Sequence, residues 1–343
     1  MQAVLDDVVA RGLTPGVAAA VVAADGHSER FFSGHKHDSD SDAVDADTIY
    51  DLASLTKLLC TTVLMARAVD DEVIALDEQP FARWPGVTVA HLLQHRSGLC
   101  AHRPLHELAI RARATGQQQG RDLVVDAVLG TLPEAAPGVR TLYSDLGFIA
   151  LGALLERRRE QPLDQLFASS SSSGLRFVCL GREGYHPCVS QVAPTERCLW
   201  RRRAVHGQVH DENAFAMGGI AGHAGLFGSL VDVEGAALAL LGSIQQDTTL
   251  RAFARAHGER GLGFDKATPG GSTGEALGPA SVGHLGFTGT SLWLDPDFVV
   301  DDHAPPGAAF VLLANTLFPT REGVLARNKE LRRAFHRAAA GLD

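Results

Sequence analysis

Strand-like patterns occur near both ends of the 343-residue chain, and a long, mainly helical region separates them. The predicted strands, which are apolar runs bounded by turn residues, cover 17–24, 30–33, 289–294, 298–300 and 308–313. A turn at Asp25-Gly26 joins the first two, and a closing helix is predicted over about 321–340. We expect the terminal strands to pair in one antiparallel sheet with the helical region inserted between them, which is an α+β layout.

The middle of the chain carries apolar residues at helical spacing. Helices are predicted at about 54–69, 87–95, 104–114, 121–131, 147–159 and 232–241, with another at the start of the chain over 1–12. The serine run 169–173 predicts a surface loop. We treat residues 1–343 as a single domain, with an α/β part at about 1–60 and 275–343 and a helical part at about 61–274.

Composition argues against several classes of function. The chain is 45% hydrophobic and 21% charged, as a soluble globular protein is, and its net charge of −9 disfavours nucleic-acid binding. No apolar run approaches the roughly 18 residues of a membrane span, and the N-terminus does not resemble a secretory signal. The five irregularly spaced cysteines fit reduced thiols, so we expect a cytoplasmic protein. The sequence leaves the oligomeric state open.

Ser54 and Lys57 stand three residues apart at the start of a predicted helix, in the sequence Ser54-Leu55-Thr56-Lys57. Residues at i and i+3 share a helix face, so the lysine amine can reach the serine hydroxyl. A serine attacks an acyl group well when a neighbouring base takes its proton, and a desolvated lysine is such a base. The pair is therefore a candidate nucleophile and base, and a helix-capping serine followed by a surface lysine is the structural alternative.

Lysine is rare in this chain. Only four of its 31 basic residues are lysine, and the other 27 are arginine. Because arginine stays protonated in proteins, a site that needs an amine base has to keep a lysine. The lysine at position 57 therefore favours the catalytic interpretation of the pair.

Two later segments offer further catalytic side chains. Tyr143 precedes Asp145 by two residues just ahead of a predicted helix, and a tyrosine near cations can act as a general base. His284 begins a strand that is punctuated by glycines, which often mark the close approach of a ligand or another backbone. We therefore expect His284 to lie over the site as a hydrogen-bond donor. A tyrosine packed at a helix start and a histidine in a turn are the structural alternatives.

In order and rough spacing, Ser54-Leu55-Thr56-Lys57, Tyr143-Ser144-Asp145 and His284-Leu285-Gly286 resemble the three motifs of the serine β-lactamase and penicillin-binding-protein superfamily. The most similar branch is that of the class C β-lactamase-related hydrolases and esterases. Further stretches that fit this branch are 87–99, 209–214, 222–227 and 286–291, and the resemblance covers about 15–318. It implies a β-lactamase-like fold, in which an antiparallel sheet flanked by helices and a helical subdomain enclose a cleft with Ser54 at its floor.

The resemblance also implies roles for individual residues. Ser54 takes the place of the acylated nucleophile, and Lys57 and Tyr143 share the role of the base. The backbone N–H groups of Ser54 and Phe287, the residue that follows the third motif, take the place of the oxyanion hole. Neither a metal nor an organic cofactor is implied.

Two positions depart from the usual motifs. His284 stands where β-lactamases and penicillin-binding proteins usually carry lysine, which weakens a fixed positive charge that would bind a substrate carboxylate. Asp145 stands where asparagine is usual; an ionised carboxylate cannot donate a hydrogen bond to a substrate amide, but it can pair with Lys57. Both changes argue against efficient β-lactam turnover.

We therefore expect a serine hydrolase that forms an acyl-enzyme, with small carboxylic esters as its substrates. An amidase, a D-amino-acid peptidase or a weak β-lactamase on the same machinery is one alternative. An acyltransferase that delivers the acyl group to a small metabolite is another. A catalytically inactive binding protein with the same fold is a third. The expected partner in every catalytic case is a small-molecule acyl substrate.

Overall fold

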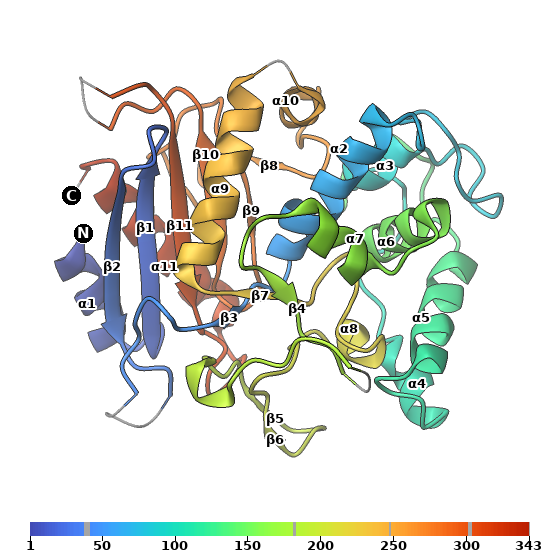
Figure 1. Ribbon diagram of the computed structural model, residues 1–343, viewed down its shortest axis with the longest axis horizontal. Helices are drawn as coiled ribbons and strands as arrows, with labels where there is room; N and C mark the ends of the chain where they lie inside the picture. Colours follow the sequence, from blue (N-terminus) through green and yellow to red (C-terminus); the bar gives the residue numbers. More distant parts are fainter. Residues whose placement is uncertain (38–41, 181–182, 247, 301–303, 343) are drawn as a thin grey trace.

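A six-stranded antiparallel sheet forms the centre of the molecule, and both ends of the chain contribute to it (Figure 1). The computed structural model describes residues 1–37, 42–180, 183–246, 248–300 and 304–342. The strand order is β2-β1-β11-β10-β9-β8. The strands are β1 (Gly16–Ala23), β2 (Ser28–Gly34), β8 (Asp265–Lys266), β9 (Val282–Leu285), β10 (Ser291–Asp295) and β11 (Ala308–Ala314). Strand β1 runs antiparallel to β11, with Val17 opposite Ala314, so the predicted pairing of the terminal strands is confirmed.

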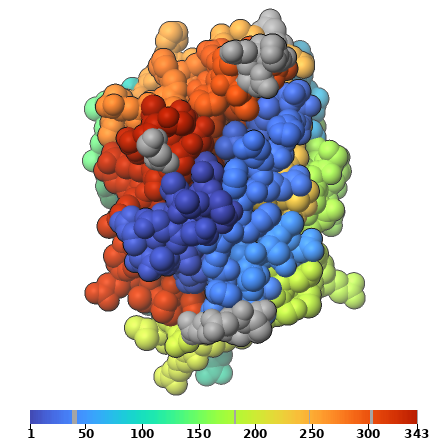
Figure 2. Space-filling model, turned by 90° about the vertical axis from the view of Figure 1, so that its left-hand side faces the viewer, coloured from blue at the N-terminus to red at the C-terminus, as the bar shows by residue number. Residues whose placement is uncertain are grey.

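Both faces of this sheet are buried, which explains why β1 and β11 are almost continuously apolar. In β11, Phe310 and Leu312 belong to the core on one face, whereas Val311 and Leu313 belong to the core on the other. Helices α1 (Gln2–Ala10) and α11 (Val324–Ala339) pack on the first face, where Figure 2 shows the two ends of the chain side by side. Helix α9 (Leu230–Gln245) covers the opposite face (Figure 1).

The remaining helices form a second region beside the sheet (Figure 1). They are η1 (Lys57–Thr62), α2 (Val63–Asp70), α3 (Val89–Leu93), α4 (His106–Arg111), α5 (Gln118–Gly130), α6 (Asp145–Arg159), α7 (Leu163–Ser170), α8 (Glu212–Ala216) and α10 (Thr249–Arg255). The short 3₁₀ turn η2 (Val189–Gln191) lies apart from them, next to the bridge between Ile49 and Val192. Helix α6 is the centre of this region, because most of its length from Leu146 to Leu155 is buried. The short strands β3 (Tyr50–Asp51), β7 (Leu226–Gly228) and β4 (Arg176–Phe177) form a small second sheet, and β5 (Arg197–Cys198) pairs with β6 (Arg203–Ala204).

Away from the three motifs, the structure differs from the sequence-based expectations at three places. Residues 298–300 form no strand; the Phe298 ring instead packs edge to face on Phe310 of β11, with centroids 5.0 Å apart, so the apolar run reflects a loop that lies on the core. The serine run is not wholly a loop, because α7 continues to Ser170. Helix α9 and strand β8 lie within 61–274 and yet belong to the sheet layers rather than to the helical part.

None of the five cysteines, all of which lie in the described part of the chain, forms a disulfide bond. Among the described residues, no helix combines the length and the apolar character that crossing a membrane requires.

Helix α11 offers a test of the core under the sheet. Phe335 is fully buried against the sheet, whereas Leu325 on the same helix is 72% exposed. We expect Phe335→Ala to lower the free energy of unfolding by about 3–5 kcal/mol, because it leaves a cavity in the core. Leu325→Ala should change it by less than about 0.5 kcal/mol. Urea unfolding of both variants measures the difference, and equal losses would contradict this packing.

Candidate active site

The nucleophile candidate Ser54 lies in a tight turn between β3 and η1. Ala53, which precedes it, has a φ angle of 47°, a conformation that costs free energy for a non-glycine residue and persists only where its surroundings enforce it. The buried Asp51 carboxylate provides that enforcement, because it accepts hydrogen bonds from the backbone N–H of Ala53 at 2.8 Å and of His210 at 2.6 Å. Asp51 thus ties the strained turn to the chain near α8.

The helix after Ser54 opens with a π-helical segment rather than with the regular α-helix that the sequence predicted. This segment, η1, covers Lys57–Thr62 and is buried over its whole length. The Thr62 side chain donates to the Lys57 carbonyl oxygen at 2.8 Å, which helps to hold the wider turn. π-Helical turns of this kind are frequent at functional sites.

The Lys57 amine is fully buried and has three oxygen partners. Its Nζ lies 2.8 Å from Asp145 Oδ1, 2.9 Å from Ser54 Oγ and 3.1 Å from the His223 carbonyl oxygen. The Asp145 carboxylate and the His223 carbonyl oxygen can only accept hydrogen bonds, whereas the Ser54 hydroxyl can accept or donate. The three contacts suit a protonated lysine that donates to Ser54.

The electrostatics agree with this assignment. Burial lowers the pKa of Lys57, but the Asp145 carboxylate outweighs burial and the net pKa lies above the ordinary value for lysine. Burial likewise raises the pKa of Asp145, but Lys57 and then His102 shift it well below its usual range. The resting site therefore contains a lysine ammonium beside an aspartate carboxylate.

Tyr143 lies against the same amine, with the centre of its ring 5.0 Å from Lys57 Nζ. Burial raises the pKa of Tyr143 and the Lys57 ammonium lowers it; the net pKa stays above the ordinary value, so the resting side chain is a phenol. His95 fixes this residue: its ring is stacked 4.5 Å from the Tyr143 ring, and its Nδ1 accepts from the Ser144 backbone N–H at 3.0 Å. His95 therefore carries its proton on Nε2 and positions the second motif.

His284 lies near the site, with its ring centroid 6.0 Å from that of Tyr143, but its chemistry differs from the expected one. Its Nδ1 lies 2.9 Å from the Leu285 carbonyl oxygen, which can only accept, so Nδ1 carries the proton. Burial, followed by Lys57 and Arg260, lowers the pKa of His284 to about 4, and the ring is neutral at pH 7. Nε2 is buried and has no partner among the described residues. The expectation of a donor is therefore corrected: the free nitrogen is an acceptor.

The third motif is also not the start of a strand. His284 stands near the end of β9, and residues 286–290 form the turn that leads into β10. Gly286 is required there because a Cβ atom would lie 1.9 Å from Thr290 Oγ1. Thr288 Oγ1 donates to the Asp51 carbonyl oxygen at 2.8 Å and Thr290 Oγ1 to that of Leu52 at 3.2 Å. These bonds fasten the turn of the third motif to the turn of Ser54.

The two backbone N–H groups expected to form an oxyanion hole are those of Ser54 and Phe287. Within the described part of the chain, neither donates a hydrogen bond. The Phe287 backbone is held in place by α11, because its carbonyl oxygen accepts a hydrogen bond from Asn328 Nδ2 at 3.0 Å. An oxyanion that develops during the reaction requires N–H donors that are unoccupied and held in a fixed position.

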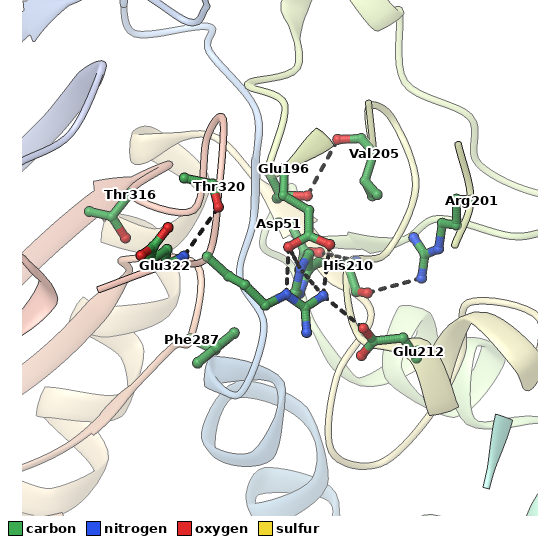
Figure 3. Close-up of polar contacts among 12 residues, drawn as sticks. Asp51, Glu196, Arg201, Val205, His210, Glu212, Phe287, Thr316, Thr320 and Glu322 are labelled. Carbon is green, nitrogen blue, oxygen red and sulfur yellow. Dashed lines mark hydrogen bonds and ion pairs between the residues drawn. The ribbon is translucent and has the colours of Figure 1, made fainter. Parts of the chain in front are cut away.

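A network of charged side chains, partly buried, lies beside Phe287 (Figure 3). The His210 and Phe287 ring centroids are 5.9 Å apart, and His210 Nε2 lies 3.3 Å from a Glu196 oxygen. Arg321, in the loop after β11, donates to both oxygens of Glu196 at 2.7 Å and to Glu212 at 2.7 Å. The network thus connects the chain around α8 with the sheet side of the site.

The sequence indicated the three motifs but not the residues that hold them in position. The structure brings Ser54, Tyr143 and Asp145 into contact with Lys57, with His284 and Phe287 nearby. Asp51, His95 and His102 were not singled out for any role. The only available signal for His95 was its place in the stretch 87–99, because its contact with Tyr143 joins residues far apart in the sequence.

The protonation state of Lys57 can be measured directly, because only four lysines are present. In the wild type we expect the Lys57 ¹⁵Nζ resonance to remain that of an ammonium up to about pH 10. Asp145→Asn removes the partner carboxylate and should lower the pKa of Lys57, so that burial dominates. Asp126→Asn, on the exposed face of α5, is the control and should change nothing. Titration of the wild-type resonance below pH 9 would contradict the ammonium assignment.

Comparison with known proteins gives a consistent family and fold. A protein of Escherichia coli O157:H7 named "Putative D-alanyl-D-alanine carboxypeptidase" is 30% identical over 292 residues, which cover 73% of this chain and 66% of that protein. Simvastatin synthase (LovD) from Aspergillus terreus superimposes with a TM-score of 0.70 at 18% identity, over 99% of this chain and 96% of that one.

A penicillin-binding protein from Bacillus halodurans has a TM-score of 0.66 at 16% identity, over 95% of this chain and 98% of that one. At such identities these two structures establish the fold alone. The model of the family described as "Beta-lactamase" matches residues 1–334, which include all three motifs and both supporting turns. With its serine and lysine in contact at the site, this chain belongs to the β-lactamase family of serine hydrolases.

Proposed function

We propose that the protein hydrolyses small carboxylic esters through an acyl-enzyme on Ser54. The observation that carries the proposal is the contact of 2.9 Å between Lys57 Nζ and Ser54 Oγ, beside a neutral His284. The family supplies the reaction class, and the residues that depart from its usual motifs support the choice of esters.

The proposed reaction has two steps. Ser54 Oγ attacks the ester carbonyl carbon while its proton passes to the base formed by Lys57 and Tyr143, and the N–H groups of Ser54 and Phe287 stabilise the oxyanion. The C–O bond to the alcohol then breaks, and the alcohol leaves with that proton. A water molecule next attacks the acyl carbon and gives a proton to the same base. The bond between Ser54 Oγ and the acyl carbon then breaks, the base returns the proton to Oγ, and the carboxylic acid leaves.

The resting protonation state imposes a pH dependence on this reaction. Lys57 as an ammonium and Tyr143 as a phenol cannot take the Ser54 proton, because the pKa of each lies above its ordinary value. One of the two has to lose a proton before Ser54 can attack. The active fraction therefore grows as pH rises, and we expect kcat/KM to rise from neutral towards alkaline pH.

The residues at positions 145 and 284, which differ from the usual motifs, support esters rather than β-lactams as the substrates. The Asp145 carboxylate is ionised and occupied by Lys57, so it cannot donate to the side-chain amide of a β-lactam. The neutral His284 supplies no positive charge for a substrate carboxylate. A simple ester needs neither contact, because it carries neither a carboxylate nor a side-chain amide.

A carboxypeptidase that acts on D-amino-acid peptides is the second candidate, and one cation favours it. The Arg260 guanidinium carbon lies 5.3 Å from the centre of the Tyr143 ring, where it can face a substrate carboxylate. Its charge is partly cancelled by an ion pair with Asp265, which is why we place this candidate second. The carboxypeptidase name of the Escherichia coli relative agrees with it.

Hydrolysis of short-chain p-nitrophenyl esters tests the proposal. Ser54→Ala and Lys57→Ala should each lower kcat/KM at least about 1000-fold, since one removes the nucleophile and the other the base. Ser190→Ala, an exposed serine outside the site, is the matched control and should keep wild-type activity.

A chromogenic cephalosporin and a D-alanyl-D-alanine dipeptide, assayed in parallel, separate the alternatives. We expect little turnover of either. Ester turnover that survives Ser54→Ala would refute the mechanism, and dipeptide turnover faster than ester turnover would establish the second candidate instead.

A further inference from the structure

The Asp145 carboxylate contacts a second cationic side chain besides Lys57. While Oδ1 lies 2.8 Å from Lys57 Nζ, Oδ2 lies 3.5 Å from Nδ1 of His102. His102 stands in the chain between α3 and α4, and its side chain is 45% exposed, whereas Lys57 is wholly buried. A solvent-accessible, titratable ring is thus connected to the buried base through one carboxylate.

We propose that His102 is a positioning residue that adjusts the base strength of Lys57 through Asp145. The inference rests on the proposed acyl transfer by Ser54. A protonated His102 shares the charge of Asp145 with Lys57, and a neutral His102 leaves that charge to Lys57 alone. The charge state of an exposed ring therefore changes how firmly the buried lysine holds its proton.

The other charges near His102 leave Asp145 as its principal partner. Asp211 and Glu212 at the start of α8 also attract a protonated His102. Asp211 is already bound to His223 at 2.8 Å, and Glu212 is bound to Arg321 at 2.7 Å. The network of Glu212 is visible in Figure 3. Arg103, the next residue in the chain, points to Thr131, to which it donates at 3.1 Å.

These surroundings determine the direction in which the pKa of His102 is shifted. The hydrogen-bonding contact with Asp145 raises the pKa of His102 above the ordinary value for histidine, and burial opposes the shift only in part. At pH 6 the ring is therefore mostly protonated, and it loses its proton at a higher pH than an ordinary histidine does.

The sign of the effect follows from Coulomb's law. A positive charge on His102 disfavours the ammonium of Lys57, lowers the pKa of Lys57 and enlarges the fraction of free amine. Loss of the His102 proton reverses this effect, while the small fraction of Lys57 that is free amine is still growing with pH. The rise of log(kcat/KM) with pH should therefore flatten around the pKa of His102 and then resume.

His102→Gln tests the proposal, because glutamine keeps a polar side chain of similar reach but does not titrate. We expect the variant to lose roughly 3- to 10-fold in kcat/KM at pH 6, which corresponds to a shift of up to about one unit in the pKa of Lys57. At pH values above the pKa of His102 it should match the wild type, and its profile should rise without the flat segment. His27→Gln, an exposed histidine in the β1–β2 turn, is the control and should retain the wild-type profile.

Two further outcomes are decisive. A loss that is equal at pH 6 and above the pKa of His102 would mean that His102 has only a structural role, and a change confined to KM would mean that it binds substrate; either result overturns the proposal. In Asp145→Asn the flat segment should move to lower pH or vanish, since His102 loses its partner.

The same pH series can be run without an ester substrate. The rate at which a fluorophosphonate labels Ser54 reports the activated serine alone, so it should show the same difference between wild type and His102→Gln even if esters are not the substrate. Labelling with no pH-dependent difference would refute the role of His102. Absence of ester turnover with the difference in labelling preserved would refute only the proposed substrate.

Discussion

The buried ammonium of Lys57 is the interaction on which the rest of the site depends. Its three bonds join the turn of Ser54, the start of α6 at Asp145 and the loop at His223, which come from separate parts of the chain. A buried charge is tolerated only when it is paired and fully hydrogen-bonded, so these three partners have to be in place together. The same bonds that satisfy the lysine therefore assemble the catalytic groups, but they also hold it in the protonated form.

The sheet places the remaining groups. Because β1 pairs with β11, and β10 pairs with both β11 and β9, the turn of the third motif lies at the end of a rigid sheet. Thr288 and Thr290 then bind the backbone just before the Ser54 turn, and Asp51 holds that turn in its strained conformation. The free N–H groups of Ser54 and Phe287 are thus set by the fold before any substrate binds.

Much of this arrangement could be predicted from sequence, because its signals are local or repeated. Apolar strand patterns at both chain ends predicted the sheet, and the spacing of Ser54 and Lys57 predicted their contact. The supports could not be predicted in this way, since His95 with Tyr143 and Asp51 with His210 are contacts between distant segments. The acceptor nitrogen of His284 was missed for another reason: the tautomer of a histidine is set by the carbonyl group beside it, and sequence does not reveal that neighbour.

The central claim is that Ser54 carries the acyl group during turnover. Intact-protein mass spectrometry after rapid acid quench, with p-nitrophenyl pivalate as a slowly hydrolysed ester, measures this most directly. We expect one added acyl mass, located by fragmentation to Ser54 and absent from Ser54→Ala. Ester hydrolysis without any acylated protein, or acylation at another residue, would contradict the account.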